Sequence, residues 1–334
     1  MFDPFAKLRK HAHDYAILFR RLRKIPSQVE ALTASLEEHR REIRLYYQAL
    51  SLPPQDLWHG RPPMVQGAPA KSAFPNSAPC RQDSFEAPYF AFWARTLQEP
   101  LRYHRKLWEF VFICQALWER GAIREGARGL GFGVGSEPLS AFFASQGCQI
   151  TATDMDVSQA EELGWTATNQ HAVGKAALRK PRICPDDLFE ANVLFRTCDM
   201  NAVPDDLTGF DFCWSACALE HLGSIEKGLA FIERSIECLK PGGLAIHTTE
   251  FNTSSDAETI DNMGTVLFRR RDFNELARRL KQRGHKVAAF DFNLGDHPVD
   301  RFIDVPPYRS QPHLQIALMG FSTTSFGLIV RRAT

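Results

Sequence analysis

The segment Gly129-Leu-Gly-Phe-Gly-Val-Gly-Ser-Glu137 decides the fold of this chain, because it carries glycines at the alternate positions 131, 133 and 135. An apolar stretch precedes these glycines, and the helical pattern Leu139-Ser-Ala-Phe-Phe-Ala-Ser145 follows them. A strand-like run, Cys148-Gln-Ile-Thr-Ala-Thr153, comes next and ends in Asp154. The order strand, glycine turn, helix, strand, acid is typical of a nucleotide-type cofactor site in a doubly wound sheet.

The composition limits the class of protein. The chain has 334 residues, a net charge of +1, 44% hydrophobic residues and 24% charged residues, as in ordinary globular proteins of one or two domains. The charge predicts no nucleic-acid partner, and no apolar run is long enough for a transmembrane segment. The basic N-terminal region lacks the apolar core of a signal peptide. Eight scattered cysteines without a CxxC pair indicate reduced thiols in a cytoplasmic protein.

Residues 1–51 form a helical block with an apolar heptad stripe. One heptad position holds Leu8, Tyr15, Leu22, Val29, Leu36, Ile43 and Leu50, and the complementary one holds Leu18, Ile25, Leu32 and Tyr46. Pro26 interrupts the stripe, and the capping box that follows it predicts that a helix restarts there. The stripe favours either a coiled coil that makes a homo-oligomer or two amphipathic helices packed on the rest of the chain. Its basic face could contact a membrane surface or simply be solvated.

The rest of the chain divides into a linker and one large domain. Residues 52–83 are rich in proline and predict a linker or an extended wrap. Residues 84–334 form the domain, which begins with an aromatic-rich helical segment (84–121). From Gly126 onward strands and helices alternate, which predicts a mostly parallel sheet with helices on both faces. A long polar loop over 295–315 interrupts this alternation near the end.

Two cofactor classes compete for the glycine turn. A dinucleotide site requires GxGxxG, but Ser136 stands at the third glycine position and the spacing is GxGxG instead. Asp154 follows the second strand, where a carboxylate can accept both ribose hydroxyls. Asp199 follows the third strand, where an acid can receive an adenine amino group. The segments Leu219-Glu-His-Leu222 and Leu239-Lys-Pro-Gly-Gly243 complete the set.

In this order, these motifs resemble the class I S-adenosylmethionine-dependent methyltransferases, over roughly residues 105 to 332. The resemblance implies a Rossmann-like, doubly wound, mostly parallel sheet of seven strands, with the last strand antiparallel and next to the fifth. It also implies S-adenosylmethionine as the cofactor, over the carboxyl ends of the first two strands. The residues that the resemblance assigns to the cofactor are Gly131, Gly133 and Gly135 near its amino-acid part, Asp154 at the ribose, Asp199 and Met200 at the adenine, and Ser215 on the methionine side. Within the class, the segments GLGFGVGSEPL and HTTEFN are similar to those of a bacterial subgroup.

One position departs from the family pattern. The family has an acid two residues before the first glycine of the turn, and Gly129 stands there in this chain. Glu137 is the candidate to replace that acid as a contact of the cofactor's ammonium group. An alternative role for Glu137 is that of a first-turn acid favoured by the helix dipole.

Candidate catalytic and substrate-binding residues follow the later strands, because ligands in open α/β sheets bind beyond the carboxyl ends of the strands. His221 and Glu250 are the candidate bases, although His221 could instead brace its loop and Glu250 could be a capping acid. Four residues of the 295–315 loop are candidate substrate contacts: His297, Asp300, Tyr308 and His313. Their spacing matches no defined metal motif, so no metal is expected.

The sequence therefore predicts an S-adenosylmethionine-dependent methyltransferase that acts on a small-molecule acceptor. Polar candidate bases and the absence of a basic stripe favour O-methylation of a sugar or another small polar molecule. Two alternatives remain open: a non-catalytic, methyltransferase-like scaffold and an NAD-dependent oxidoreductase.

Overall fold

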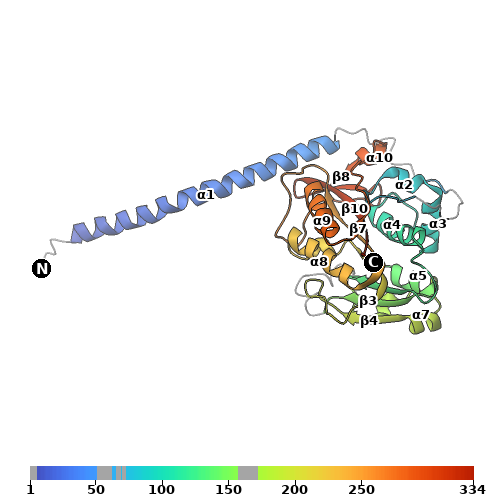
Figure 1. Ribbon diagram of the computed structural model, residues 1–334. Helices are drawn as coiled ribbons and strands as arrows, with labels where there is room; N and C mark the ends of the chain where they lie inside the picture. Colours follow the sequence, from blue (N-terminus) through green and yellow to red (C-terminus); the bar gives the residue numbers. More distant parts are fainter. Residues whose placement is uncertain (1–5, 51–61, 65–68, 70–72, 157–171) are drawn as a thin grey trace.

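The structure is a computed structural model, and it describes residues 6–50, 62–64, 69, 73–156 and 172–334. Figure 1 shows a central sheet with helices on both faces and one long helix, α1 (Ala6–Leu50), that projects from it. The other helices are α2 (Gln82–Glu86), α3 (Pro88–Thr96), α4 (Arg105–Glu119), α5 (Leu139–Ser145), α7 (Asp186–Asn192), α8 (Ile225–Glu237), α9 (Arg270–Gln282) and α10 (Pro298–Arg301), with the 3-10 turns η2 (Lys175–Leu178) and η3 (Leu219–His221). No helix within these described ranges is long and apolar enough to span a bilayer.

The sheet has the strand order β4-β3-β2-β5-β6-β10-β9-β8, and β1 and β7 also pair with β10. The strands are β1 (Ala78–Pro79), β2 (Arg128–Phe132), β3 (Gln149–Asp154), β4 (Val193–Thr197), β5 (Phe210–Ala216), β6 (Leu239–Asn252), β7 (Lys286–Val287), β8 (Ile303–Asp304), β9 (Gln315–Leu318) and β10 (Phe321–Arg331). The five strands from β4 to β6 are parallel. They place five carboxyl ends along one edge of the sheet.

Strand β10 is antiparallel to β6, in a register that runs from Thr323 opposite Asn252 to Arg331 opposite Leu244. The predicted antiparallel last strand beside the fifth parallel strand is therefore confirmed. The strand count differs, because the described residues hold ten strands rather than seven. β10 is eleven residues long, and its free edge and ends accommodate the short strands β1, β7 and β9, with β8 beyond β9.

The glycines of β2 make room for large rings on β5. A Cβ atom at Gly129 would lie 2.5 Å from the Phe212 ring, and one at Gly131 would lie 2.5 Å from the Trp214 ring. Leu130 and Phe132 alternate with these glycines and are fully buried in the core on the opposite face of the sheet. The sequence of β2 thus places small residues on one face and large residues on the other.

The aromatic-rich segment forms α2, α3 and α4, which pack on the face of the sheet where the rings of β5 lie. Phe85, Phe90, Trp93 and Trp108 are all at most 2% exposed, in one core cluster with Trp214. Residues 73–81, which the sequence assigned to the linker, belong to this domain, because β1 pairs with β10. The rest of the predicted linker lies mostly outside the described residues.

One local prediction is wrong. The helix does not restart at Pro26, because α1 continues through it, although a proline within a helix costs about 3 kcal/mol. The segment Leu239-Lys-Pro-Gly-Gly243 begins β6 and produces the register shift between Phe210 and Phe212 on the neighbouring strand.

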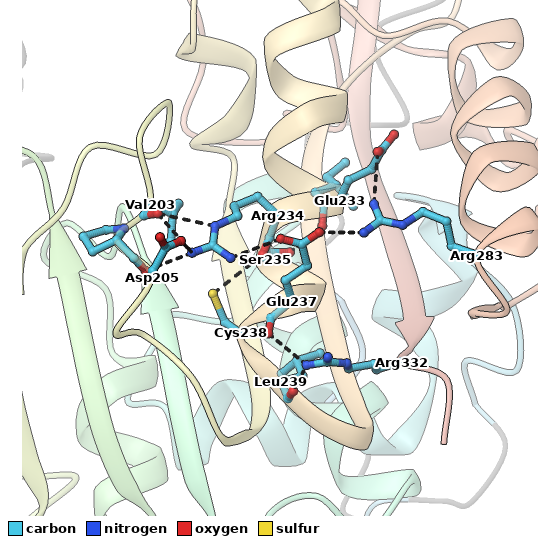
Figure 2. A network of polar contacts seen from close by, with 12 residues as sticks. Val203, Asp205, Glu233, Arg234, Ser235, Glu237, Cys238, Leu239, Arg283 and Arg332 are labelled. Atoms are coloured by element: carbon cyan, nitrogen blue, oxygen red, sulfur yellow. Dashed lines mark hydrogen bonds and ion pairs between the residues drawn. The ribbon is translucent and has the colours of Figure 1, made fainter.

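A network of arginines joins α8 to the segments around it (Figure 2). Arg234 on α8 donates to the carbonyl oxygen of Val203 and to the carboxylate of Asp205, beyond β4. Arg283, which follows α9, pairs with Glu233 and Glu237 of α8. These contacts fix α8 and α9 on the sheet and thereby the loops that precede them at the carboxyl edge.

Candidate active site

A cavity of about 610 Å³ lies at the carboxyl edge of the parallel strands. This volume falls in the range of sites for small molecules and cofactors. The residues that follow strands β2, β3, β4 and β5 form most of its wall. The aromatic-rich helical segment (84–121) contributes Glu99, Lys106 and Phe110. The lining residues at the strand ends are Gly133, Val134, Gly135, Ser136, Glu137, Pro138, Asp154, Met155, Cys198, Asp199, Met200, Asn201, Ala216, Cys217, Ala218, His221 and Leu222.

The glycine turn between β2 and α5 forms one wall of the cavity. Gly133 and Gly135 have φ angles of 55° and 50°, which favour glycine over any other residue. A Cβ atom at Gly133 would also lie 2.8 Å from the Cβ atom of Ala218 across the cavity wall. At these two positions the turn therefore exposes backbone rather than side chains to whatever binds there.

Asp154 connects this turn to the end of β3. Its Oδ2 atom accepts hydrogen bonds from the backbone N–H groups of Gly135 and Ala172, each at 3.0 Å. Its Oδ1 atom accepts from the N–H of Met155 at 2.9 Å. The carboxylate thus holds the glycine turn in place, and it lines the cavity at the position assigned to a ribose contact.

Asp199 and Met200 also line the cavity, in the turn after β4, the strand that pairs with β3. The Asp199 Oδ1 atom accepts a hydrogen bond from the backbone N–H of Asn201 at 2.8 Å. Met200 is 9% exposed and presents its thioether near Gly133, 3.3 Å from where a Cβ atom would lie. The structure brings both candidate adenine contacts to the cavity.

Ser215 is placed differently from the prediction. It is fully buried, and its hydroxyl lies 2.8 Å from Nδ1 of His247 in the core. Side chains alternate between the two faces of a sheet, and Ser215 lies on the face that packs against α8, where Ser235 also contacts His247. Ala216, Cys217 and Ala218 line the cavity in its place.

Glu137 lines the cavity, and the structure explains why the usual strand acid is missing. The Phe212 ring occupies the space where a side chain at Gly129 would begin. The indole N–H of Trp214, on the same strand as Phe212, donates to Oε1 of Glu137 at 2.7 Å. Burial is the main reason that the pKa of Glu137 rises to about 8, although the Trp214 hydrogen bond acts in the opposite direction. The site therefore holds one carboxyl that ionises readily only when a cation is beside it.

Lys106 is a cavity residue that the sequence did not single out. Its Nζ atom donates to Oε2 of Glu109 at 2.9 Å and to the carbonyl oxygen of Ala216 at 3.2 Å. Burial alone would lower the pKa of Lys106, but the neighbouring negative groups, Glu109 first among them, together outweigh burial and raise the pKa above its ordinary value. The only sequence signal was a lysine within an aromatic helix, which is too common a pattern to mark a site.

His221 lines the cavity on η3, in the loop that follows β5. Its Nδ1 atom lies 3.0 Å from the carbonyl oxygen of Gly264. A carbonyl only accepts, so Nδ1 carries the proton and Nε2 is the basic nitrogen. Burial lowers the pKa of His221 below its ordinary value, so the ring is neutral near pH 7.

Glu250 lies behind the cavity wall rather than in it. It is 4% exposed, forms an ion pair with Arg105 and accepts a hydrogen bond from Thr323 at 2.7 Å. Ligand atoms of Glu250, Cys217 and Glu220 lie within 4.8 Å of one another. Burial, together with the charge of Glu250, raises the pKa of Glu220 to about 8. Cys217 also lines the cavity. Glu250 is therefore connected to the cavity through its cluster with Cys217 and Glu220.

The four candidate substrate contacts of the 295–315 loop do not line the cavity. Asp300 is 3% exposed and accepts from the backbone N–H groups of Gln82 and His297, so it caps α10 and joins it to α2. His297 is exposed at the start of α10, and the Tyr308 hydroxyl donates to a backbone oxygen of β9. The loop folds against α2, α4 and β10 because it carries strands of its own, β8 and β9.

His313 belongs to a separate buried pair. Its Nδ1 atom lies 2.6 Å from Oδ2 of Asp304, and its ring stacks on that of His104 at 4.6 Å between centroids. Asp304 is fully buried. Burial lowers the pKa of both histidines, to about 3 in His104. These contacts join the loop to the start of α4, one residue before Arg105.

No family model matches the chain, and none of the curated proteins searched matches it in sequence. Solved structures match it at low identity. A putative sarcosine dimethylglycine methyltransferase from Galdieria sulphuraria is 14% identical with a TM-score of 0.42, over 74% of this chain and 99% of that one. Magnesium protoporphyrin IX methyltransferase from Synechocystis is 13% identical with a TM-score of 0.40, over 75% and 98%. Phosphoethanolamine N-methyltransferase 2 from Haemonchus contortus is 16% identical with a TM-score of 0.40, over 66% and 52%.

These likenesses are distant, and the strand order of the chain itself is the stronger observation. Five parallel strands in the order β4-β3-β2-β5-β6, followed by an antiparallel β10, make the Rossmann-like fold of class I methyltransferases. A dinucleotide-binding Rossmann sheet continues with a parallel strand at that position.

Proposed function

We propose that this protein is an S-adenosylmethionine-dependent methyltransferase that binds its cofactor in the cavity at the carboxyl edge of the sheet. The observation that carries the proposal is the convergence of the glycine turn, Asp154 and Asp199 on one cavity beside an antiparallel last strand. Backbone exposed by glycines suits the close approach of a ligand, and two acids at the ends of the neighbouring strands β3 and β4 suit ribose hydroxyls and an adenine amino group. The volume of about 610 Å³ leaves room for an acceptor beside the cofactor.

Glu137 would receive the positive end of the cofactor. It lies in the cavity wall, is oriented by Trp214, and carries a carboxyl whose pKa is raised by burial. A cation beside it would favour its ionised form and would form a charge-assisted hydrogen bond. Its place in the wall supports the replacement of the family's strand acid by an acid from the following turn.

His221 is the group best placed to accept a proton from the acceptor. S-adenosylmethionine, when bound, supplies an electrophilic methyl group on a sulfonium. The protein's part is to orient a hydroxyl toward that carbon and to take its proton, for which His221 offers a neutral imidazole with Nε2 as the basic nitrogen. Glu250 would act through Arg105 and the buried acids beside Cys217. We propose an oxygen acceptor on a sugar or another small polar molecule, because His221 and Lys106 bring polar groups to the lining.

Calorimetry with S-adenosylmethionine, S-adenosylhomocysteine and NAD tests this proposal. We expect both sulfur compounds to bind and NAD not to bind. A Gly133→Val variant should lose this binding, since its side chain would meet Ala218, whereas Gly174→Val, with nothing within 4 Å of the added Cβ, should retain it. Preference for NAD would overturn the proposal in favour of an oxidoreductase. Absence of binding by all three compounds would overturn it in favour of a non-catalytic scaffold.

A further inference from the structure

Helix α1 carries an apolar stripe that the described part of the chain leaves exposed. Nine side chains at heptad positions a and d are 39% to 78% exposed. At position a they are Tyr15, Leu22, Val29, Leu36, Ile43 and Leu50, and at position d they are Ile25, Leu32 and Tyr46. The helix has 45 residues and is therefore about 68 Å long. A stripe of this length is far larger than the scattered apolar residues of an ordinary surface.

The exposure does not result from a helix that is detached from its own domain. Leu45 and Ala49 are 5% and 8% exposed, and α1 contacts β10. Arg41 forms an ion pair with Glu258 at 3.1 Å, and its guanidinium lies over the Phe321 ring. The C-terminal end of α1 is thus docked, while the rest of the helix projects from the domain (Figure 1).

The docked face and the apolar stripe lie on opposite sides of α1. At 100° per residue, the centre of the stripe lies roughly 170° around the helix from the face that holds Arg41, Leu45 and Ala49. Ile43 and Leu50, which lie in the docked turns, are still 68% and 78% exposed. The domain therefore does not cover the stripe even where it contacts the helix. The apolar stripe of α1 therefore requires a partner other than the chain's own domain.

We propose that this occupant is a second copy of the chain, in a parallel, in-register coiled coil. An apolar stripe with a seven-residue repeat stays in contact with another helix over several turns only if that helix has the same repeat. A second copy of the chain, related by a two-fold axis, presents such a helix. Nine side chains from each copy, at roughly 80 to 100 Å² each, would bury about 1,500 Å², the size of a stable protein interface. A lone helix that contains Pro26 and exposes these side chains lacks the tertiary packing that stabilises most helices.

The flanking positions also suit a parallel pair. In that arrangement each g residue faces the e residue of the partner's next heptad, and like charges there would repel. No described pair opposes like charges: the pairs are Gln28–Thr33, Ser35–Arg40 and Glu42–Tyr47. His39 occupies a d position and would face its own copy, and a single polar residue in such a seam fixes the register.

Light scattering on the full chain tests the association. We expect twice the monomer mass of 37.8 kDa at micromolar concentration. Leu32→Glu places a charge in the seam and should give the monomer mass, while Ala34→Glu, exposed two residues away at position f, should leave the dimer intact. Because Leu32 is 64% exposed in one chain, the thermal unfolding of the methyltransferase domain and its cofactor binding should be unchanged in both variants. A wild-type monomer at tens of micromolar would overturn the proposal.

Disulfide formation tests the orientation. In a parallel, in-register pair, a cysteine at position a lies beside its own copy, so Val29→Cys should give a covalent dimer under mild oxidation. Ala34→Cys should not, and the wild type provides the background from its native cysteines, which are buried except for Cys217. A dimer without the Val29→Cys cross-link, equal cross-linking in both variants, or a monomer that binds vesicles of anionic lipid would each contradict the proposal.

Discussion

Replacing Glu137 by glutamine should stabilise the cofactor-free protein at alkaline pH while weakening cofactor binding. The pKa of Glu137 rises from 4.5 to about 8 in the folded state, mainly through burial. Between pH 4.5 and about 8, the folded protein keeps this carboxyl protonated while the unfolded chain releases the proton. The contribution of Glu137 to the free energy of unfolding is therefore fully present below pH 4.5 and is lost as the pH rises to about 8. At 1.36 kcal/mol per unit, this loss amounts to about 3 to 5 kcal/mol, and glutamine avoids it. The glutamine carbonyl can still accept the hydrogen bond from Trp214.

Urea unfolding at pH 5, 7 and 9 measures this effect. We expect the free energy of unfolding of Glu137→Gln to match that of the wild type at pH 5 and to exceed it by about 3 to 5 kcal/mol at pH 9. Glu220, whose pKa is also raised to about 8, is present in both proteins, so the difference isolates Glu137. Glu125→Gln, at an exposed carboxyl, is the control and should follow the wild type.

The same variant should bind S-adenosylmethionine about 10 to 150 times more weakly, since a hydrogen bond to a charged group contributes about 1.5 to 3 kcal/mol. Isothermal titration calorimetry at pH 7.5 measures this change. Equal pH dependence of stability in the variant and the wild type would refute the account of the buried carboxyl. Unchanged affinity would refute its role as the receptor of the cofactor's positive end.

Three further predictions concern the neighbouring residues. Gly129→Asp restores the family's acid, but it should destabilise the domain by several kcal/mol and should not tighten cofactor binding, because the Phe212 ring already fills the space. The control, Gly174→Asp, places its side chain in open space and should leave thermal unfolding unchanged. His221→Ala should lower turnover by about 10² to 10⁴ with unchanged cofactor affinity, and in the wild type the lowered pKa should extend activity to pH values below 6.5. Glu250→Ala should also lower turnover without changing cofactor affinity, and it should cost about 3 to 5 kcal/mol of stability, because Arg105 would keep a buried charge without its partner. Unchanged turnover in both of these last variants would remove the two residues as candidate bases.

The sequence predicts the sheet well because each strand carries its own signal. The glycine turn, the acids after β3 and β4 and the alternating strands and helices are local features, and the structure places them at one edge of the sheet. The long-range pairing of β10 was expected only through the family resemblance. No local pattern could have indicated that short segments such as Ala78–Pro79 pair with the same strand.

The candidate site was predicted less completely, because its other residues depend on packing between distant segments. Lys106 reaches the cavity only because α4 crosses the end of β5, and Ser215 misses it because of the side-chain alternation along that strand. The loop over 295–315 has the polar composition of a binding segment. Its Asp300 and His313 instead make contacts within the fold, which the sequence could not distinguish from contacts with a ligand.

The position of β10 in the chain has a consequence for how the protein is made. The ribosome delivers β6 well before β10, so until then β6 has one edge without a neighbour, and β1 and β7 have no strand to pair with. Edges of this kind pair readily with other chains, and sheets with such distant pairings form slowly. The last strand therefore closes the sheet in a single late step. We expect chaperone dependence and aggregation during synthesis to increase with the time that passes between the synthesis of β6 and the synthesis of β10.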